Sequence, residues 1–262
     1  MANYIDQEIL CEAYTHFEIA EFPSKQELDR IKQDLVAFFD ERAKFLFGED
    51  VRVEVEFEEG SLKTRLKVLG KSALVAAALL SQYGSIRQGI DTIAKDSTLL
   101  AQSGVLEIAF RTKTAFCDSV AVEKRKGVYG RASAFMSELD PIREEFSRSA
   151  FPEKQSEIKL FEKRVGDLIA WDLRVDELFG KLQNDATKAC IAAGLLEELD
   201  RLPNQAVWAS LLSNKSFRAQ VILSDPQLSS RLGSAVGGME KAVAVVKKKM
   251  LDRVNQFAPQ KT

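Results

Sequence analysis

The sequence predicts a mainly α-helical protein with a small α+β region at its N-terminus. Residues 51–69 alternate apolar and charged side chains on either side of a Glu-Gly pair, which is typical of an antiparallel β-hairpin. Residues 24–48 and 157–257 repeat apolar side chains at three- and four-residue steps, which is typical of amphipathic helices. The composition, 45% hydrophobic and 29% charged, is that of a folded globular chain.

A strand and a helix are predicted before the hairpin. Residues 13–22 mix aromatic and β-branched side chains and end before Pro23, so they predict a strand. Ser24 and Glu27 have the spacing of a capping box and open a helix that ends at Gly48. The chain therefore begins with the order β-α-β-β.

The hairpin register is predicted from its side-chain pattern. A two-residue turn at Glu59-Gly60 places Glu56 opposite Lys63 and keeps the apolar residues together on the other face. A loop with an odd number of residues would set apolar side chains opposite charged ones, because one step of register flips every side chain. In this register Arg52 faces Lys67, which is the single unfavourable pair.

The rest of the chain predicts helices. Residues 72–80 predict a buried helix, since they are too few for the roughly 20 residues that a membrane span requires. Ser85 is expected to cap the next helix, and residues 105–122 have no sustained period. Further helices are predicted at 130–139, 157–182, 186–199, 205–212 and 236–257.

Two domains are predicted from the pattern of these elements. The stretch from Ser147 to Gln155 contains Phe151-Pro152 and is the best candidate boundary. We therefore expect a small α+β region with helices at 1–150 and an all-helical domain at 151–262.

Charge and cysteine usage limit the function. The 37 basic and 39 acidic residues give a formal net charge of -2, whereas a dedicated nucleic-acid binder is more often strongly basic. Cys11, Cys117 and Cys190 are too widely scattered for a disulfide framework or a metal-ligand motif. The N-terminus lacks the basic-then-apolar run of a secretory signal. We expect a soluble chain in the cytoplasm, with no metal and no cofactor.

No catalytic residue is predicted. His16 is the single histidine and lies beside Phe17 in the first predicted strand, where a packed or exposed side chain is the ordinary role. An enzyme alternative, a metal-dependent hydrolase or nuclease, would use Glu54, Glu56 or Asp91. The hairpin register favours a charge-paired sheet face instead, because the two glutamates face basic residues across the strands.

A basic segment at 111–131 supports a nucleic-acid alternative. Its charged residues are interleaved with Phe110, Phe116 and Tyr129, and this combination suits phosphate contacts and base stacking, although a run of charges is usually a solvated surface. The candidate binding residues are Arg111, Lys113, Lys124, Arg125, Lys126 and Arg131.

A membrane-active alternative is based on the apolar segments within residues 72–110. Lys71, Arg87 and Asp91 interrupt this block, and a charge near the bilayer centre is costly. No constitutive membrane insertion is therefore expected. These segments are predicted to pack in the core against the apolar face of the hairpin.

Three short segments resemble a family of uncharacterised bacterial proteins. They are the run EVEFEEGSLK at residues 54–63, YGSIRQGID at 83–91 and RKGVYGR at 125–131. The resemblance covers residues 50–131 and implies a bacterial accessory protein. It brings no activity and no functional residue to this chain.

The leading hypothesis is a non-enzymatic interaction or adaptor subunit of a bacterial accessory system. Long amphipathic helices without a convergent set of polar side chains are typical of such subunits. The chain would present these helices to a protein partner or to a second copy.

Overall fold

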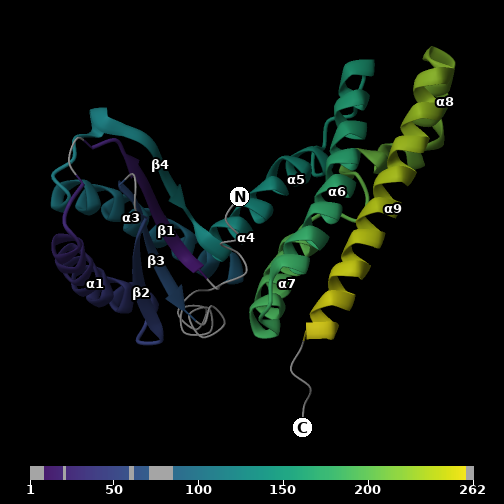
Figure 1. The fold of residues 1–262 in the computed structure, drawn as a ribbon. Coiled ribbons are helices and arrows are strands. Elements are labelled where there is room, and N and C mark those ends of the chain that lie inside the picture. Colours follow the sequence, from purple (N-terminus) through teal and green to yellow (C-terminus); the bar gives the residue numbers. More distant parts are fainter. Residues whose placement is uncertain (1–8, 20–21, 59–61, 71–84, 258–262) are drawn as a thin grey trace, which may run out of the picture. The chain divides into compact units, whose positions relative to one another are not determined.

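The computed structural model describes residues 9–19, 22–58, 62–70 and 85–257. By their contacts the residues form two compact units, Met1–Ser133 and Ala134–Thr262. The first unit contains a β-sheet covered by helices, and the second is helical (Figure 1). The chain is therefore mainly α with a small β region, as the sequence predicts.

The sheet of the first unit has four antiparallel strands in the order β2-β3-β1-β4. With the helices α1 and α3, the order along the described chain is β-α-β-β-α-β, the split βαβ arrangement. Such a sheet has two central strands and two edge strands. The bounds are β1 Ile9–Phe17, α1 Lys25–Phe47, β2 Val51–Glu58, β3 Leu62–Gly70, α3 Ile86–Arg111 and β4 Ser119–Arg125.

The helices α1 and α3 begin where the sequence predicts. The Ser24 hydroxyl accepts a hydrogen bond from the Glu27 backbone N–H, and the Glu27 carboxylate accepts one from the Ser24 N–H, which completes the predicted capping box. Ser85 likewise caps α3 by accepting from the backbone N–H of Gln88. The predicted helix at 72–80 lies outside the described residues.

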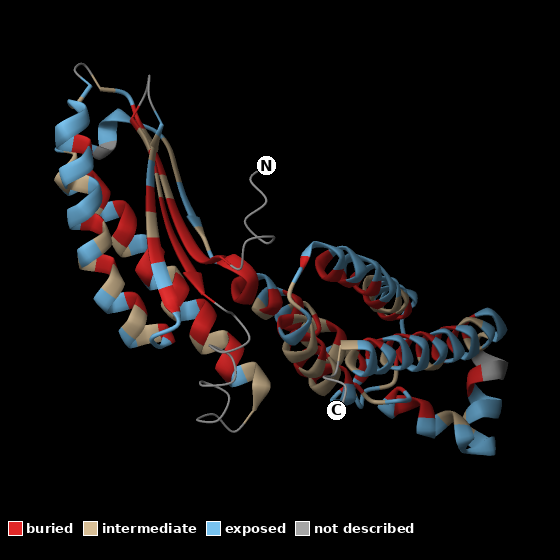
Figure 2. Ribbon diagram, turned by 60° about the horizontal axis from the view of Figure 1, so that its bottom comes forward, coloured by how far each residue is buried: buried red, intermediate tan, exposed pale blue. Residues whose placement is uncertain are grey.

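The core of the unit lies between the sheet and these two helices. Leu35 and Phe39 of α1 and Ile90 and Ile93 of α3 are fully buried. In Figure 2 the buried residues follow β1 and β3 and the sheet-facing sides of the helices. A close approach fixes α3, because a Cβ at Gly104 would lie 2.9 Å from the Cβ of Ala13 on β1.

The hairpin between β2 and β3 is present, but its register differs by two residues from the prediction. Glu58 pairs with Lys63 and Glu54 with Lys67. A two-residue turn at Glu59-Gly60 would instead pair Glu54 with Arg65. The even spacing is kept, which preserves the faces. In the observed register Lys67 faces Glu54 instead of Arg52, and Arg52 faces Leu69.

Two further boundaries differ from the sequence analysis. β1 begins four residues before the predicted strand at 13–22 and ends at Phe17, because Cys11 and Glu12 are also buried in the sheet. Within residues 105–122, which show no period, α3 continues to Arg111, a short 3-10 helix covers Phe116–Asp118, and β4 begins at Ser119.

The second unit is built from long helices that pack on one another. α9 packs against α6, α7 and α8, while α5 packs against α6. The core includes Trp171, Phe161 and Met239, which are fully buried. The bounds are α4 Gly127–Glu138, which crosses the junction between the units, α5 Asp140–Phe146, α6 Gln155–Lys181, α7 Asp185–Asp200, a 3-10 helix Val207–Ser213, α8 Lys215–Ser224 and α9 Pro226–Phe257.

Candidate interaction surface

A groove opens between α1 and α3 on the side of these helices that faces away from the sheet. Its cavity volume is about 530 Å³, which is within the usual range for binding clefts. We call it the α1–α3 groove. The groove is lined by Glu41, Arg42, Phe45 and Leu46 of α1 and by Leu99, Leu100 and Ser103 of α3.

Large apolar side chains project to solvent in and beside this groove. Phe45 is 89% exposed, and on α3 Leu99 is 55%, Leu106 54% and Phe110 77% exposed. The three α3 residues follow at seven- and four-residue steps, so they lie along one outward stripe of the helix. We call Leu99, Leu106 and Phe110 the α3 ridge. Apolar groups gathered in this way on a surface mark interaction sites more often than isolated ones do.

Arginines of both helices border the apolar residues. The Arg42 guanidinium lies 3.5 Å from the centre of the Phe38 ring and donates to the Phe38 carbonyl. Arg111 forms ion pairs with Asp34 of α1 at 3.1 Å and Glu107 at 2.7 Å. An apolar surface with aromatic and arginine neighbours has the composition of protein–protein interface centres.

The sheet face away from the helices carries rows of opposite charges. Arg125 of β4 binds the buried carboxylate of Glu12 at 2.9 Å, and Lys67 binds Glu56 at 3.0 Å. Tyr14 lies between Arg65 and Arg125, with 5.7 and 5.6 Å from its ring centre to their guanidinium carbons. Five basic and five acidic residues alternate there by register: Arg52, Lys63, Arg65, Lys67 and Arg125, against Glu12, Glu54, Glu56, Glu58 and Glu123.

The candidate nucleic-acid residues are distributed over several elements. Arg111 ends α3 and Lys113 follows it. Lys124 and Arg125 lie at the C-terminal end of β4, and because they are neighbours in a strand their side chains point to different faces of the sheet. Lys126 precedes α4 and Arg131 lies on it. The structure therefore brings only parts of this set together, and the balanced charge of the sheet face adds no excess of positive charge. Nucleic-acid binding stays a prediction.

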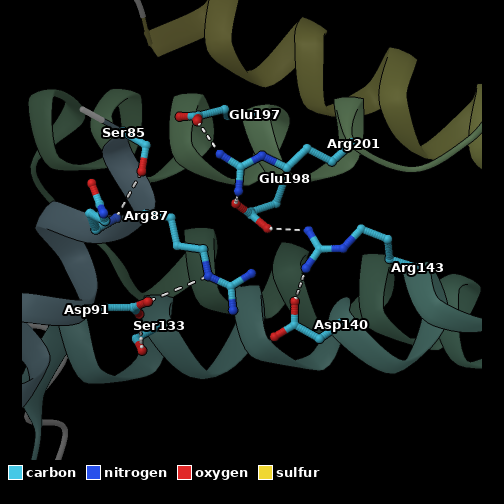
Figure 3. Close-up of polar contacts among 10 residues, drawn as sticks. Ser85, Arg87, Asp91, Ser133, Asp140, Arg143, Glu197, Glu198 and Arg201 are labelled. Carbon is cyan, nitrogen blue, oxygen red and sulfur yellow. Dashed lines mark hydrogen bonds and ion pairs between the residues drawn. The ribbon is translucent and has the colours of Figure 1, made fainter. Parts of the chain in front are cut away.

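The acidic candidates of the enzyme alternative have basic or polar neighbours. Glu54 pairs with Arg52 at 3.2 Å, and Asp91 accepts from the Ser133 hydroxyl at 2.7 Å and pairs with Arg87 (Figure 3). Among the residues that the structure describes, no group of three or more His, Cys, Asp and Glu side chains could hold a metal ion. His16 lies half-buried on the charged sheet face, opposite Lys63.

Two cysteines, the buried Cys11 and the half-buried Cys190, are poor nucleophiles. Burial, with a further contribution from the neighbouring Glu12 carboxylate, raises the pKa of the Cys11 thiol to about 12. Burial also raises the pKa of the Cys190 thiol to about 11. Since the thiolate is the reactive form, both side chains remain protonated and unreactive near neutral pH.

Ion pairs of the second unit join its helices. Glu198 of α7 is fully buried and binds Arg143 of α5 at 3.1 Å and Arg201, which directly follows α7 (Figure 3). Asp172 of α6 is also buried and binds Lys249 at 2.7 Å and Arg253 at 3.2 Å, both on α9. These contacts connect helices, so they are structural in character.

The sequence shows no sustained period over residues 105–122, so sequence reasoning missed the α3 ridge. A signal was present in the sequence, because α3 carries apolar residues on more of its circumference than one buried face requires. None of the described helices combines the length and the apolar composition that crossing a bilayer requires. Comparisons of the chain with models of known families, with curated proteins and with solved structures gave no match.

Proposed function

We propose that this chain is a non-enzymatic interaction subunit that binds an amphipathic helix of a protein partner in the α1–α3 groove. The observation that carries the proposal is the α3 ridge, which exposes Leu99, Leu106 and Phe110 along one stripe, and of these Leu99 lines the groove together with Phe45. Burying a large apolar side chain contributes about 1.5–3 kcal/mol, so a partner that covers these residues gains affinity from each.

The shape of the surface favours a helical ligand. A groove between two packed helices accepts a third helix whose apolar residues recur at three- and four-residue steps, which is a common mode of peptide recognition. Phe45 and Phe110 are the expected anchors because exposed aromatic rings gain most when a partner excludes water from them. Arg42 and Glu41 line the same groove and would pair with charges at the edge of the bound helix.

The proposal includes a cytoplasmic location in a bacterial accessory system. Cys11, Cys117 and Cys190 are all free, as thiols are in a reducing compartment. The resemblance of three sequence segments to a bacterial family supports the bacterial context.

Site-specific photo-crosslinking in the source cell tests the proposal. A photoreactive residue replaces Leu106 on the α3 ridge, and in a matched variant it replaces Leu173, which is 60% exposed on α6. We expect one discrete protein adduct at position 106 and none at position 173. The adduct should disappear when Leu99→Asp and Phe45→Asp are added, because both changes place a charge in the groove.

Two outcomes would contradict the proposal. One is the absence of an adduct when the photoreactive residue is placed in turn at each position of the α3 ridge, 99, 106 and 110. The other is an adduct that forms equally at Leu173, which would indicate non-specific contact with apolar residues. Circular dichroism of the groove variants checks that both aspartate substitutions leave the fold intact.

A further inference from the structure

β4 is an edge strand with an accessible outer side. Among the strands that the structure describes, its single neighbour is β1, and none of its seven residues is buried. In Figure 1 it lies at the margin of the sheet. An edge of this kind presents backbone N–H and C=O groups to which another strand can add.

The two edges of the sheet differ in charge. On β2, Glu54, Glu56 and Glu58 alternate along one face, so two copies that joined at this edge would bring like charges together. β4 instead carries Ala121 and Val122, then the mixed charges Glu123, Lys124 and Arg125. Self-pairing is therefore open to β4 and opposed at β2.

We propose that the chain forms a two-fold symmetric dimer in which β4 pairs antiparallel with β4 of a second copy. This surface is separate from the α1–α3 groove. The two-fold axis lies at Val122, the midpoint of Ser119–Arg125, so that each residue of the strand lies opposite a residue of β4 in the second copy. It places Glu123 opposite Ala121 of the second copy and Val122 opposite itself, so no like charges face each other.

Neighbouring registers are less favourable. An axis at Glu123 would set the two Glu123 carboxylates opposite each other, and an axis at Lys124 would do the same for two ammonium groups. An axis at Ala121 would leave the Lys124 and Arg125 end of each strand beyond its partner. The register irregularity between His16 and Phe17 lies next to Ser119, so the central pairs from Ala121 to Glu123 stay regular.

The dimer would contain one continuous sheet with four strands from each copy. A two-fold axis perpendicular to a sheet keeps corresponding faces on the same side. Since α3 packs on β1 and β4, both copies of α3 would lie on one side of this sheet. A partner with two helices could then engage both α1–α3 grooves at once and gain avidity.

Two substitutions at Ala121, which is half-buried and opposite His16, test the register. In the dimer, residue 121 faces Glu123 of the second copy, and symmetry makes this contact twice. Ala121→Lys should lower the dimer dissociation constant by about 2- to 30-fold and Ala121→Glu should raise it by a similar factor, as expected for two cross-strand charge pairs. Sedimentation equilibrium of the full-length protein over a concentration series measures both.

A crosslinking experiment tests the axis. With Cys117→Ser to remove the exposed native thiol, Val122→Cys should join two copies through a short bis-maleimide, since directly opposed residues lie within a few ångströms. The Leu99→Asp/Phe45→Asp double variant is the control: it should leave dimerisation unchanged while removing the photo-adduct at position 106, so the two proposals fail separately. A monomer at all concentrations, a dimer that responds alike to both Ala121 variants, or no crosslink at position 122 would each overturn the inference.

Discussion

At the scale of single residues, the Asp172–Arg253 pair makes a buried contact whose removal should be costly. The Asp172 and Arg253 side chains are 5% and 11% exposed. Arg253→Met leaves a buried carboxylate without this partner and should lower the free energy of unfolding by about 3–5 kcal/mol. Adding Asp172→Leu should restore much of that loss. The exposed Arg174–Glu138 pair is the control, where Arg174→Met should cost at most about 1 kcal/mol. Urea unfolding measures each variant.

Two glycines should respond in opposite directions to the same substitution. Gly127 has a φ of 63°, and a Cβ there would lie 2.2 Å from the carbonyl oxygens of Ile9 and Leu10. Gly127→Ala should therefore destabilise the protein by more than the roughly 1–2 kcal/mol of a left-handed alanine. Gly166 lies inside α6 with nothing within 4 Å of its added Cβ. Gly166→Ala should stabilise by about 0.5–1 kcal/mol, and thermal unfolding distinguishes the two.

At the scale of elements, the contact between α6 and α9 should weaken in acid. The hydrogen bond from Arg231 of α9, which joins Nε to Oε1 at 2.7 Å, lowers the pKa of the Glu162 carboxyl of α6 below its ordinary value of 4.5. The stabilisation is therefore complete above about pH 4.5 and is lost as pH falls through the lowered pKa. Glu162→Gln should reduce stability at pH 7 and have little further effect near pH 3. Glu177→Gln, at an exposed position on α6, is the matched control for the removal of one carboxylate.

The elements also differ in how far the sequence predicts them. Ser24 and Ser85 place two helix starts correctly because a cap depends on residues only three positions apart. The hairpin register was wrong by two residues, since side-chain parity excludes odd loops but does not separate one even loop from the next. β4 gave no signal because its exposed residues lack the alternation of a half-buried strand. The α3 ridge was missed because apolar residues predict burial until the packing of the helix is known.

At the scale of the whole molecule, the position of the boundary between the two units can be tested with fragments. Trp171 donates from Nε1 to the Phe135 carbonyl at 2.9 Å, and the Phe146 ring lies 5.4 Å from that of Phe161. A fragment 134–262 keeps these contacts, whereas 151–262, the predicted helical domain, lacks Phe135 and Phe146. We expect the shorter fragment to be less stable by at least about 3 kcal/mol in urea unfolding, because it loses two buried aromatic side chains. Equal stability of the two fragments would place the boundary at residue 150 instead.

The central position of β1 also determines when this strand can complete its pairing during translation. The Glu12–Arg125 contact joins residues 113 positions apart, because β1 precedes the other three described strands of the sheet along the chain and β4 follows them. At about 5–20 residues per second, the ribosome needs roughly 6–23 s to make the intervening chain. Proteolysis of stalled nascent chains should show β1 protected only after β4 has emerged. During each round of translation, the apolar side chains of β1 therefore need a transient binding partner, such as a chaperone, until β4 has been synthesised.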